Sequence, residues 1–426
     1  MRQLVSLTRP DADLSPTEVD DHVHKHLDGK PLSDHGVWVW YRWSRTLVHL
    51  LPRDEFRQVR TDRNRYKIAP EEQRRLARAW IGIVGLSVGN ATAVTLALEG
   101  IGGSFKIADF DRLELSNLNR LRGSVADPGV EKSILAARQM FEIDPYLEID
   151  RFAAGVAADT VDEFLLGTGR LDLLIEECDD LYIKILIRER ARAYGIPVLM
   201  DTSDRGLLGI ERFDLEPDRP IQHGLLGSVQ ATELRATTAA DRVPLTLAIL
   251  GEDRLSTRSA ASLPEIGRTV GRWPQLASEV TLGAAIGADT ARRLLLGEPI
   301  GSGRFHIDLA ALMVDRGGEY HTPISPGPLF EIAPEARAGF PLPPEPARRA
   351  KISEAAVRWI AAVGTLAPPA HNAQPWSLLW RGDEAVLECR KEAELHSMQY
   401  SAGWCNDGLR WWRPSNQVGG QLRRWV

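Results

Sequence analysis

Residues 81–93 have the sequence IGIVGLSVGNATA, and this stretch decides how the neighbouring segments are interpreted. A short apolar run, Ile81 to Val84, meets the turn Gly85-Leu86-Ser87-Val88-Gly89, and a helix-forming segment follows. A G-x-S-x-G turn of this kind can expose a nucleophilic serine in an α/β-hydrolase. A glycine turn can also aim the N-terminus of a helix at a phosphate group. The two interpretations predict different enzymes.

The surrounding sequence alternates apolar strand candidates with amphipathic helix candidates, as in a doubly wound, Rossmann-like α/β fold with a mostly parallel sheet. In the first helix, Ala91, Val94 and Leu98 form one apolar stripe, and Gly100 is placed to end the helix. We expect strands within 78–85, 104–111, 147–156, 170–180 and 196–204, and helices within 90–100, 129–144 and 181–195.

Composition narrows the class of protein. The 426 residues are 43% hydrophobic and 26% charged, which is typical of a soluble protein with more than one domain. The net charge of -6 provides no overall attraction to nucleic acid. No apolar run is long enough to span a membrane, and the first residues lack a signal-peptide core, so we expect a cytoplasmic protein. The three cysteines form no C-x-x-C pair.

We divide the chain into an N-terminal extension (1–60), the α/β domain (61–325), a proline-rich linker (326–350) and a C-terminal segment (351–426). In the extension, Trp38, Trp40 and Trp43 begin with strand-like alternation, and we expect this aromatic segment to pack on the next domain. His22, His24 and His26 alternate as well, and a strand there would present them on one face. A solvated polar segment is favoured over a metal site at these histidines, because no carboxylate-histidine spacing accompanies them. The sequence after residue 395 is irregular, and we interpret it as a frameshifted or truncated tail.

The residues that follow the glycine turn favour a phosphate site over a serine nucleophile. Asp109 follows the turn at close to the offset, about 20 residues, at which a Rossmann-type fold places a carboxylate on ribose hydroxyls. Asn117 and Arg120 can clamp phosphate oxygens, and Lys132 adds a second cation. Asp179, after the fourth strand, offers a hard oxygen ligand for Mg²⁺. This set predicts a triphosphate site.

The blocks RNRYKI, IVGLSVGN, ADFDRLELSNLNR, VEKSILAAR and LIEECDD resemble, in order and spacing, the adenylate-forming family of ThiF, MoeB, HesA and the ubiquitin-activating enzymes. The resemblance implies ATP and Mg²⁺ as ligands, with Asp179 holding the metal. It implies catalytic roles for Arg120, Lys132, Asp179 and Arg65, the last reaching into the site of a second subunit of a homodimer. The nucleotide-binding residues that it implies are Gly85, Ser87, Gly89, Asp109, Asp111, Asn117, Arg120 and Lys132.

The activity implied is the activation of a carboxylate as an acyl-adenylate. The resemblance suggests the C-terminus of a ubiquitin-like or sulfur-carrier protein as substrate, with a modified tRNA as a less favoured alternative. This sequence departs from the family in three places. The glycine turn is one residue shorter, Leu121 replaces a common glutamine, and Asp180 replaces a common asparagine. Two other hypotheses stay open: an NAD- or FMN-linked oxidoreductase, and a nucleotide-binding protein without turnover.

Near the C-terminus, the stretch TLAPPAHNAQPWSLLW resembles the opening motif of nitroreductase-like flavoproteins. His371, Asn372, Gln374 and Trp376 carry this likeness. Such a domain is an α+β fold much longer than the segment present, so we expect only a partial nitroreductase-like region and no functional FMN site in this truncated chain. The fusion of the two parts is typical of bacteria.

Overall fold

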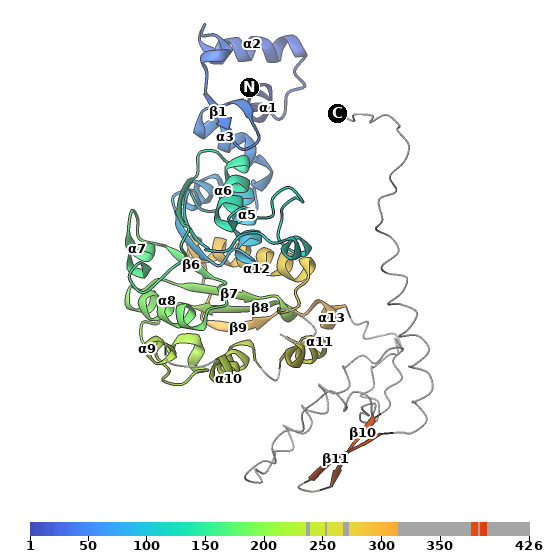
Figure 1. The fold of residues 1–426 in the computed structure, drawn as a ribbon. Coiled ribbons are helices and arrows are strands. Elements are labelled where there is room, and N and C mark those ends of the chain that lie inside the picture. The colour runs from blue at the N-terminus through green and yellow to red at the C-terminus, as the bar shows by residue number, and fades with distance from the viewer. Residues whose placement is uncertain (236–238, 252–253, 267–271, 314–375, 382–383, 390–426) are drawn as a thin grey trace, which may run out of the picture. The chain divides into compact units, whose positions relative to one another are not determined.

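A computed structural model describes residues 1–235, 239–251, 254–266, 272–313, 376–381 and 384–389. The chain divides into two compact units, residues 1–255 with 275–314, and residues 256–274 with 315–426. The first unit contains the glycine turn and is drawn from blue to orange in Figure 1. The linker predicted at 326–350 lies outside the described residues, as do His371, Asn372 and Gln374.

A seven-stranded mixed sheet, ordered β5-β4-β3-β6-β7-β8-β9, forms the centre of the first unit. Strands β5, β4, β3, β6 and β7 are parallel, and β8 and β9 are added antiparallel at one edge. The strands span β3 Trp80–Val84, β4 Ser104–Ala108, β5 Glu148–Phe152, β6 Leu173–Glu176, β7 Val198–Thr202, β8 Leu207–Glu211 and β9 Gly303–His306. The five strands expected from the sequence are confirmed, and the antiparallel edge was not foreseen.

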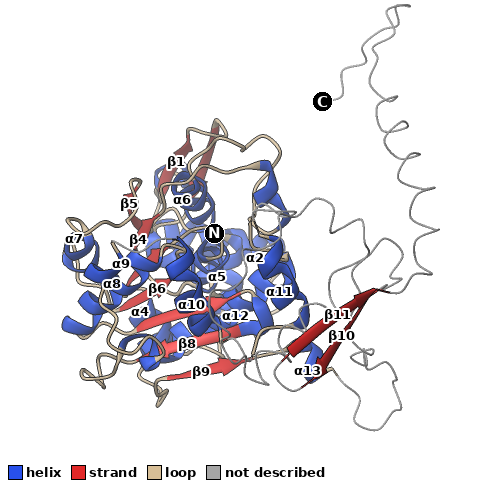
Figure 2. Cartoon of the chain, turned by 60° about the horizontal axis from the view of Figure 1, so that its bottom comes forward, coloured by secondary structure: helices blue, strands red, loops and turns tan. Residues whose placement is uncertain are grey.

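Helices cover both faces of this sheet (Figures 1 and 2). Alternate strand residues supply the two cores, because successive side chains of a strand point to opposite faces. Ile81 and Ile83 of β3 join one core with α5 (Gly89–Glu99), α6 (Lys132–Ile143) and α12 (Ala277–Leu296). Val84 joins the other core, with α7 (Val161–Leu166) and α8 (Leu181–Ala193).

Helix α5 ends where the sequence predicts, at Gly100, which adopts a left-handed conformation with φ 68°. Ala91 and Val94 of the predicted stripe are buried, but Leu98 is 51% exposed, so its assignment to the core was wrong. The helix is surrounded by the sheet, α6 and α12, and its buried side chains therefore lie on most of its circumference.

The N-terminal segment consists of α1 (Arg2–Thr8), α2 (Pro16–Leu27), the hairpin β1 (Val37–Tyr41) and β2 (Thr46–Leu50), and α3 (Arg53–Arg60). A capping box between Ser15 and Glu18 starts α2. The three alternating histidines therefore lie on a helix, where positions two apart do not share a face, and the strand-like interpretation was wrong. The hairpin contacts α6 through Tyr41, whose hydroxyl donates to the Phe141 carbonyl oxygen at 3.0 Å. Trp38 and Trp40 are more than half exposed, so the expected packing of the aromatic segment is confirmed only in part.

The remaining helices and strands complete the described part of the chain. They are α4 (Pro70–Leu76), α9 (Ala231–Leu234), α10 (Ala239–Leu250), α11 (Thr257–Ser262), α13 (Leu309–Leu312), β10 (Trp376–Arg381) and β11 (Glu384–Cys389), with 3-10 turns η1 (Leu32–Asp34), η2 (Asp62–Asn64), η3 (Leu115–Asn119), η4 (Asp204–Gly206), η5 (Ile221–Gly224) and η6 (Leu263–Glu265). Within the described part of the chain, every helix is too short or too polar to cross a lipid bilayer.

Candidate nucleotide-binding site

The glycine turn connects the carboxyl end of β3 to the first turn of α5. Gly85 has a φ of 86°, a backbone conformation that side chains disfavour. A Cβ atom at this position would lie 2.6 Å from the carbonyl oxygen of Glu177, in the segment after β6. Gly89 is also confined, since a Cβ there would lie 2.9 Å from Ile83. Both glycines are thus required for the turn to pass close to its neighbours.

Asp109, directly after β4, fixes the shape of this turn. One carboxylate oxygen accepts the backbone N–H of Leu86 at 2.7 Å, and the other accepts the N–H of Asp111 at 2.7 Å. Burial raises the pKa of Asp109, although the hydrogen bonds and the charge of Lys132 oppose that shift. A carboxylate has about four lone-pair positions, so these two bonds leave acceptor sites for ribose hydroxyls. The structural task of Asp109 was not anticipated from the sequence.

The segment around η3 brings Arg120 to the glycine turn. The guanidinium of Arg120 donates to the Ser87 hydroxyl at 3.1 Å and to the Asn119 side chain at 2.9 Å. Asn117 is buried and uses its side-chain oxygen to accept the backbone N–H of Glu114 at 3.0 Å, which caps η3. The structure therefore brings Ser87 and Arg120 together, whereas Asn117 shapes the segment that carries Arg120. Contact of Asn117 with phosphate stays a prediction.

Lys132 is the first residue of α6 and lies beside Asp111. Its buried ammonium group contacts the Asp111 carboxylate at 2.7 Å, and its backbone N–H donates to the Asp111 carbonyl oxygen at 2.9 Å. Asp109 links this pair to the glycine turn through the Asp111 N–H. An ammonium group carries three donors, so the pair with Asp111 leaves donors for a further anion.

Asp179 lies on the exposed segment after β6, which neighbours β3 in the sheet. Because the carboxyl ends of parallel strands lie at the same edge, Asp179 shares an edge with the glycine turn. The next residue, Asp180, caps α8 by accepting the backbone N–H groups of Tyr182 and Ile183. The shape of this segment thus depends on the start of α8.

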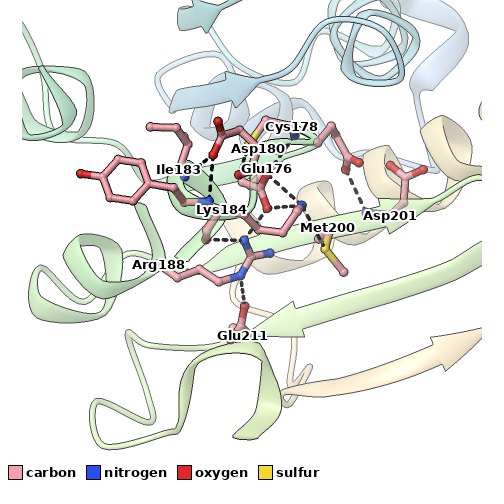
Figure 3. Close-up of polar contacts among 11 residues, drawn as sticks. Glu176, Cys178, Asp180, Ile183, Lys184, Arg188, Met200, Asp201 and Glu211 are labelled. Atoms are coloured by element: carbon pink, nitrogen blue, oxygen red, sulfur yellow. Dashed lines mark hydrogen bonds and ion pairs between the residues drawn. The ribbon is translucent and has the colours of Figure 1, made fainter. Parts of the chain in front are cut away.

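A buried charge network holds the segment after β6 in place, and Figure 3 shows the members of this network. The carboxylate of Glu176 accepts from Lys184 at 2.8 Å and from Arg188, which also donates to Glu211 at 2.7 Å. Burial opposes ionisation of Glu176, but the charges of Lys184 and Arg188 outweigh it and lower the pKa of Glu176 to about 2. Sequence analysis missed this network, although the spacing of Lys184 and Arg188 on one helix face was available as a signal.

Cys178 lies within this network, and its backbone N–H donates to the Glu176 carboxylate at 2.8 Å. Burial raises the pKa of its thiol well above the usual value, and the neighbouring Glu176 charge adds to that effect. The thiol is therefore protonated at neutral pH. Since the thiolate is the reactive form, Cys178 is a poor nucleophile here.

The buried carboxyl groups of Glu177 and Asp201 lie close to each other and to the glycine turn. Glu177 accepts the backbone N–H of Asp201 at 2.8 Å, and its side chain lies against Gly89. Burial raises the pKa of both carboxyl groups, that of Asp201 to about 6, and the charge of Asp201 raises that of Glu177 further. Burial thus disfavours ionisation of both carboxyl groups in the folded protein. Neither acid was singled out from the sequence, because Glu177 follows β6 whereas Asp201 lies in a separate strand, β7.

Arg65 lies away from this edge. Its guanidinium pairs with Asp62 at 3.0 Å, and the neighbouring Asn64 donates to the carbonyl oxygen of Glu99 at 2.9 Å. Glu99 ends α5, whereas Gly89 begins it at the glycine turn. Arg65 is thus at the opposite end of α5 from the other candidate residues. Its contact with a site in another subunit stays a prediction.

The matches to known proteins agree with this arrangement. Residues 61–206 match the family model described as the ThiF family. This part of the chain, which we call the ThiF domain, therefore matches the ThiF family. It contains the glycine turn, Asp109, the η3 segment, Lys132 and Asp179. His223, His306 and His321, which follow the glycine turn in the chain and could serve a serine nucleophile as bases, all lie outside it.

The similarity to known proteins extends beyond residues 61–206. The chain is 46% identical over 356 residues to the uncharacterized protein MT1398 of Mycobacterium tuberculosis, a match that covers 83% of this chain and 48% of that protein. It is 25% identical over 220 residues to the sulfur carrier protein ThiS adenylyltransferase of Bacillus subtilis, covering 50% of this chain and 64% of that enzyme. The chain thus spans about half to two thirds of the length of these two relatives.

Among solved structures, the chain is similar to E. coli tRNA N6-threonylcarbamoyladenosine dehydratase, TcdA, in complex with AMP. The sequence identity is 15%, the TM-score is 0.41, and the match covers 56% of this chain and 95% of that one.

Proposed function

We propose that the ThiF domain binds ATP at the carboxyl edge of β3, β4 and β6 and activates a carboxylate as an acyl-adenylate. The observation that carries this proposal is the convergence of two cationic side chains on one glycine turn. Arg120 contacts Ser87 within the turn, and Lys132 pairs with Asp111, whose backbone N–H donates to Asp109, the acid that fixes the turn. A turn that leads into a helix N-terminus, with an arginine and a lysine beside it, is suited to a polyphosphate.

The local shape supports nucleotide binding. Gly85 and Gly89 let the turn pass close to Glu177 and Ile83, and the turn leads into the N-terminus of α5, where backbone N–H groups can meet phosphate oxygens. In the first turn of α5, the side-chain oxygen of Asn90 is buried and finds no hydrogen-bond donor among the described residues. A nucleotide hydroxyl group would satisfy this acceptor.

Asp179 suits a magnesium ion. Its carboxylate is exposed at the same edge, and Mg²⁺ prefers hard oxygen ligands supplied by one or two carboxylates together with phosphates. The ion, when bound, would supply neutralisation of the negative charge on the β- and γ-phosphates.

The reaction needs no protein nucleophile. An oxygen of the substrate carboxylate attacks the α-phosphorus, a new P–O bond forms, and the bond to the leaving pyrophosphate breaks. Arg120 and Lys132 would stabilise the charge that accumulates on the phosphate oxygens, which is how positioning and electrostatics accelerate such a transfer. Since the substrate enters as a carboxylate, no proton has to be removed in this step.

For the substrate, we propose the C-terminus of a small sulfur-carrier or ubiquitin-like protein, with a modified tRNA as the alternative. The match to the Bacillus subtilis ThiS adenylyltransferase supports the first choice. We further propose a homodimer in which Arg65 completes the neighbouring site. We also propose that residues 351–426 form a partial nitroreductase-like region that has no FMN site.

The activity is tested by exchange of labelled pyrophosphate into ATP, with a sulfur-carrier protein added to the full chain. We expect exchange that depends on the carrier and is abolished in Lys132→Ala. Exchange that persists in this variant would contradict the proposed role of Lys132. ATP binding without exchange for any carrier or tRNA would favour a nucleotide-binding protein without turnover.

A further inference from the structure

Three side chains from separate elements meet in the N-terminal segment, outside the ThiF domain. His26 lies in the last turn of α2, His35 directly follows η1, and Glu55 lies in the first turn of α3. The Nε2 atom of His26 contacts one oxygen of Glu55 at 2.8 Å, and the Nε2 atom of His35 contacts the other at 2.9 Å. Residues that lie far apart in sequence thus converge on one carboxylate.

The geometry is that of a facial set of ligands. One ligand atom from each of the three residues lies within 4.8 Å of the other two. The His26 and His35 rings are packed edge to face with centroids 5.4 Å apart, so both can direct Nε2 toward a common point. A tetrahedral ion with bond lengths of about 2.0–2.2 Å could take both nitrogens and one Glu55 oxygen as ligands.

The surroundings leave room for a further ligand. The side chains of His26, Glu55 and His35 are 40%, 22% and 18% exposed, so the cluster is neither closed by the core nor fully solvated. Two imidazoles and one carboxylate, with a position open to water, are a donor set that Zn²⁺ accepts. Mg²⁺ and Ca²⁺ prefer oxygen ligands alone.

We propose that His26, Glu55 and His35 bind a divalent transition-metal cation, of which Zn²⁺ is the expected one. The ion replaces the imidazole N–H donors at Nε2, and the two rings then carry their protons at Nδ1. It joins the end of α2 to the start of α3 and closes the loop between His26 and His35. Its role is to hold the N-terminal segment together.

The direct test is the zinc content of the full chain. The protein is stripped with chelator, desalted, dialysed against Zn²⁺ in the presence of excess Mg²⁺, and analysed for bound metal. Excess Mg²⁺ keeps carboxylate sites such as Asp179 from being counted. We expect one Zn²⁺ per chain in the wild type, and affinity reduced at least tenfold in His35→Gln and in Glu55→Gln.

His22→Gln is the matched control, because His22 and His26 are four residues apart on α2 and could chelate an ion at the helix surface without His35. We expect this variant to bind Zn²⁺ like the wild type. Loss of binding in His22→Gln with retention in His35→Gln would overturn the proposal, as would the absence of bound Zn²⁺ in the wild type. Circular dichroism establishes that each variant is folded. The absorption spectrum of the Co²⁺-loaded wild type reports whether the site is tetrahedral.

Discussion

The carboxylate of Asp109 accepts the backbone N–H of Leu86 at 2.7 Å, and this bond links the end of β4 to the glycine turn after β3. The same carboxylate orders the backbone at Asp111, whose side chain holds Lys132. One acid therefore sets the position of both the turn and a cation of the proposed phosphate site.

Replacing Asp109 with alanine removes both acceptors and leaves the buried Leu86 N–H without its partner. An unsatisfied buried donor costs about 1–3 kcal/mol. We expect the free energy of unfolding to fall by this amount, together with at least a tenfold loss of affinity for Mg²⁺-ATP. Chemical denaturation and calorimetric titration measure the two effects. Wild-type affinity in a folded Asp109→Ala protein would show that the turn does not depend on this acid.

Gly85→Ala should damage the turn by sterics as well as by backbone strain, because a Cβ atom would lie 2.6 Å from the Glu177 backbone. The control is Gly129→Ala, since Gly129 has a similar φ of 91° but nothing within 4 Å of the added atom. The control should cost about 1–2 kcal/mol, the penalty of a left-handed conformation. Gly85→Ala should cost more than the control and weaken nucleotide binding. Equal losses of stability in the two variants would contradict the close approach.

The buried network around Arg188 makes a separate prediction for stability. Arg188→Met leaves Glu176 and Glu211 buried without this partner, and breaking such a pair costs about 3–5 kcal/mol. Arg190→Met on the same helix is the matched control, because its pair with Asp162 is partly exposed to solvent and contributes about 0–1 kcal/mol. Urea denaturation of both proteins checks the difference. Similar midpoints would mean that the network is not buried as described.

The pKa of Asp201 predicts a pH-dependent gain in stability for Asp201→Asn. Burial raises this pKa from 3.8 to about 6, so above pH 3.8 the unfolded chain loses the proton while the folded protein keeps it. The wild type is therefore destabilised as pH rises from about 4 to about 6, whereas the asparagine variant is not. The stability of the variant relative to the wild type should rise across this range, by about 1–3 kcal/mol, and then level off.

Asp162→Asn is the control of opposite sign. The hydrogen bond from Arg190 lowers the pKa of Asp162, so its carboxylate favours the folded state at neutral pH. The stability of this variant relative to the wild type should fall as pH rises toward about 4, the pKa of the unfolded chain, and stay level above it. Melting temperatures recorded from pH 3 to pH 8 distinguish the two behaviours, and parallel curves for Asp201→Asn and the wild type would contradict the raised pKa.

Local patterns predicted much of this structure. The sequence predicted strands β3 to β7 from their apolar runs, and it predicted the end of α5 at Gly100. Both predictions were possible because strand burial and glycine conformation are local properties. The meeting of Ser87 with Arg120 was also anticipated, since both follow strands that end at one edge. The pairing of Glu177 with Asp201 could not be predicted from the sequence, because it depends on which strands become neighbours in the sheet. Leu98 was misassigned for a related reason: which face of a helix is covered depends on its partners.

The measurement that bears most directly on the proposed site is thermal stability with Mg²⁺-ATP, NAD and FMN in turn. It is made on the wild type, on Arg120→Ala and on Arg112→Ala, an arginine whose exposed side chain pairs with Glu131. At about a hundred times its dissociation constant, a ligand stabilises a protein by about 2.7 kcal/mol. We predict a rise in melting temperature with Mg²⁺-ATP alone, retained in Arg112→Ala and lost in Arg120→Ala. A rise with NAD or FMN and none with Mg²⁺-ATP would contradict the account and point to an oxidoreductase.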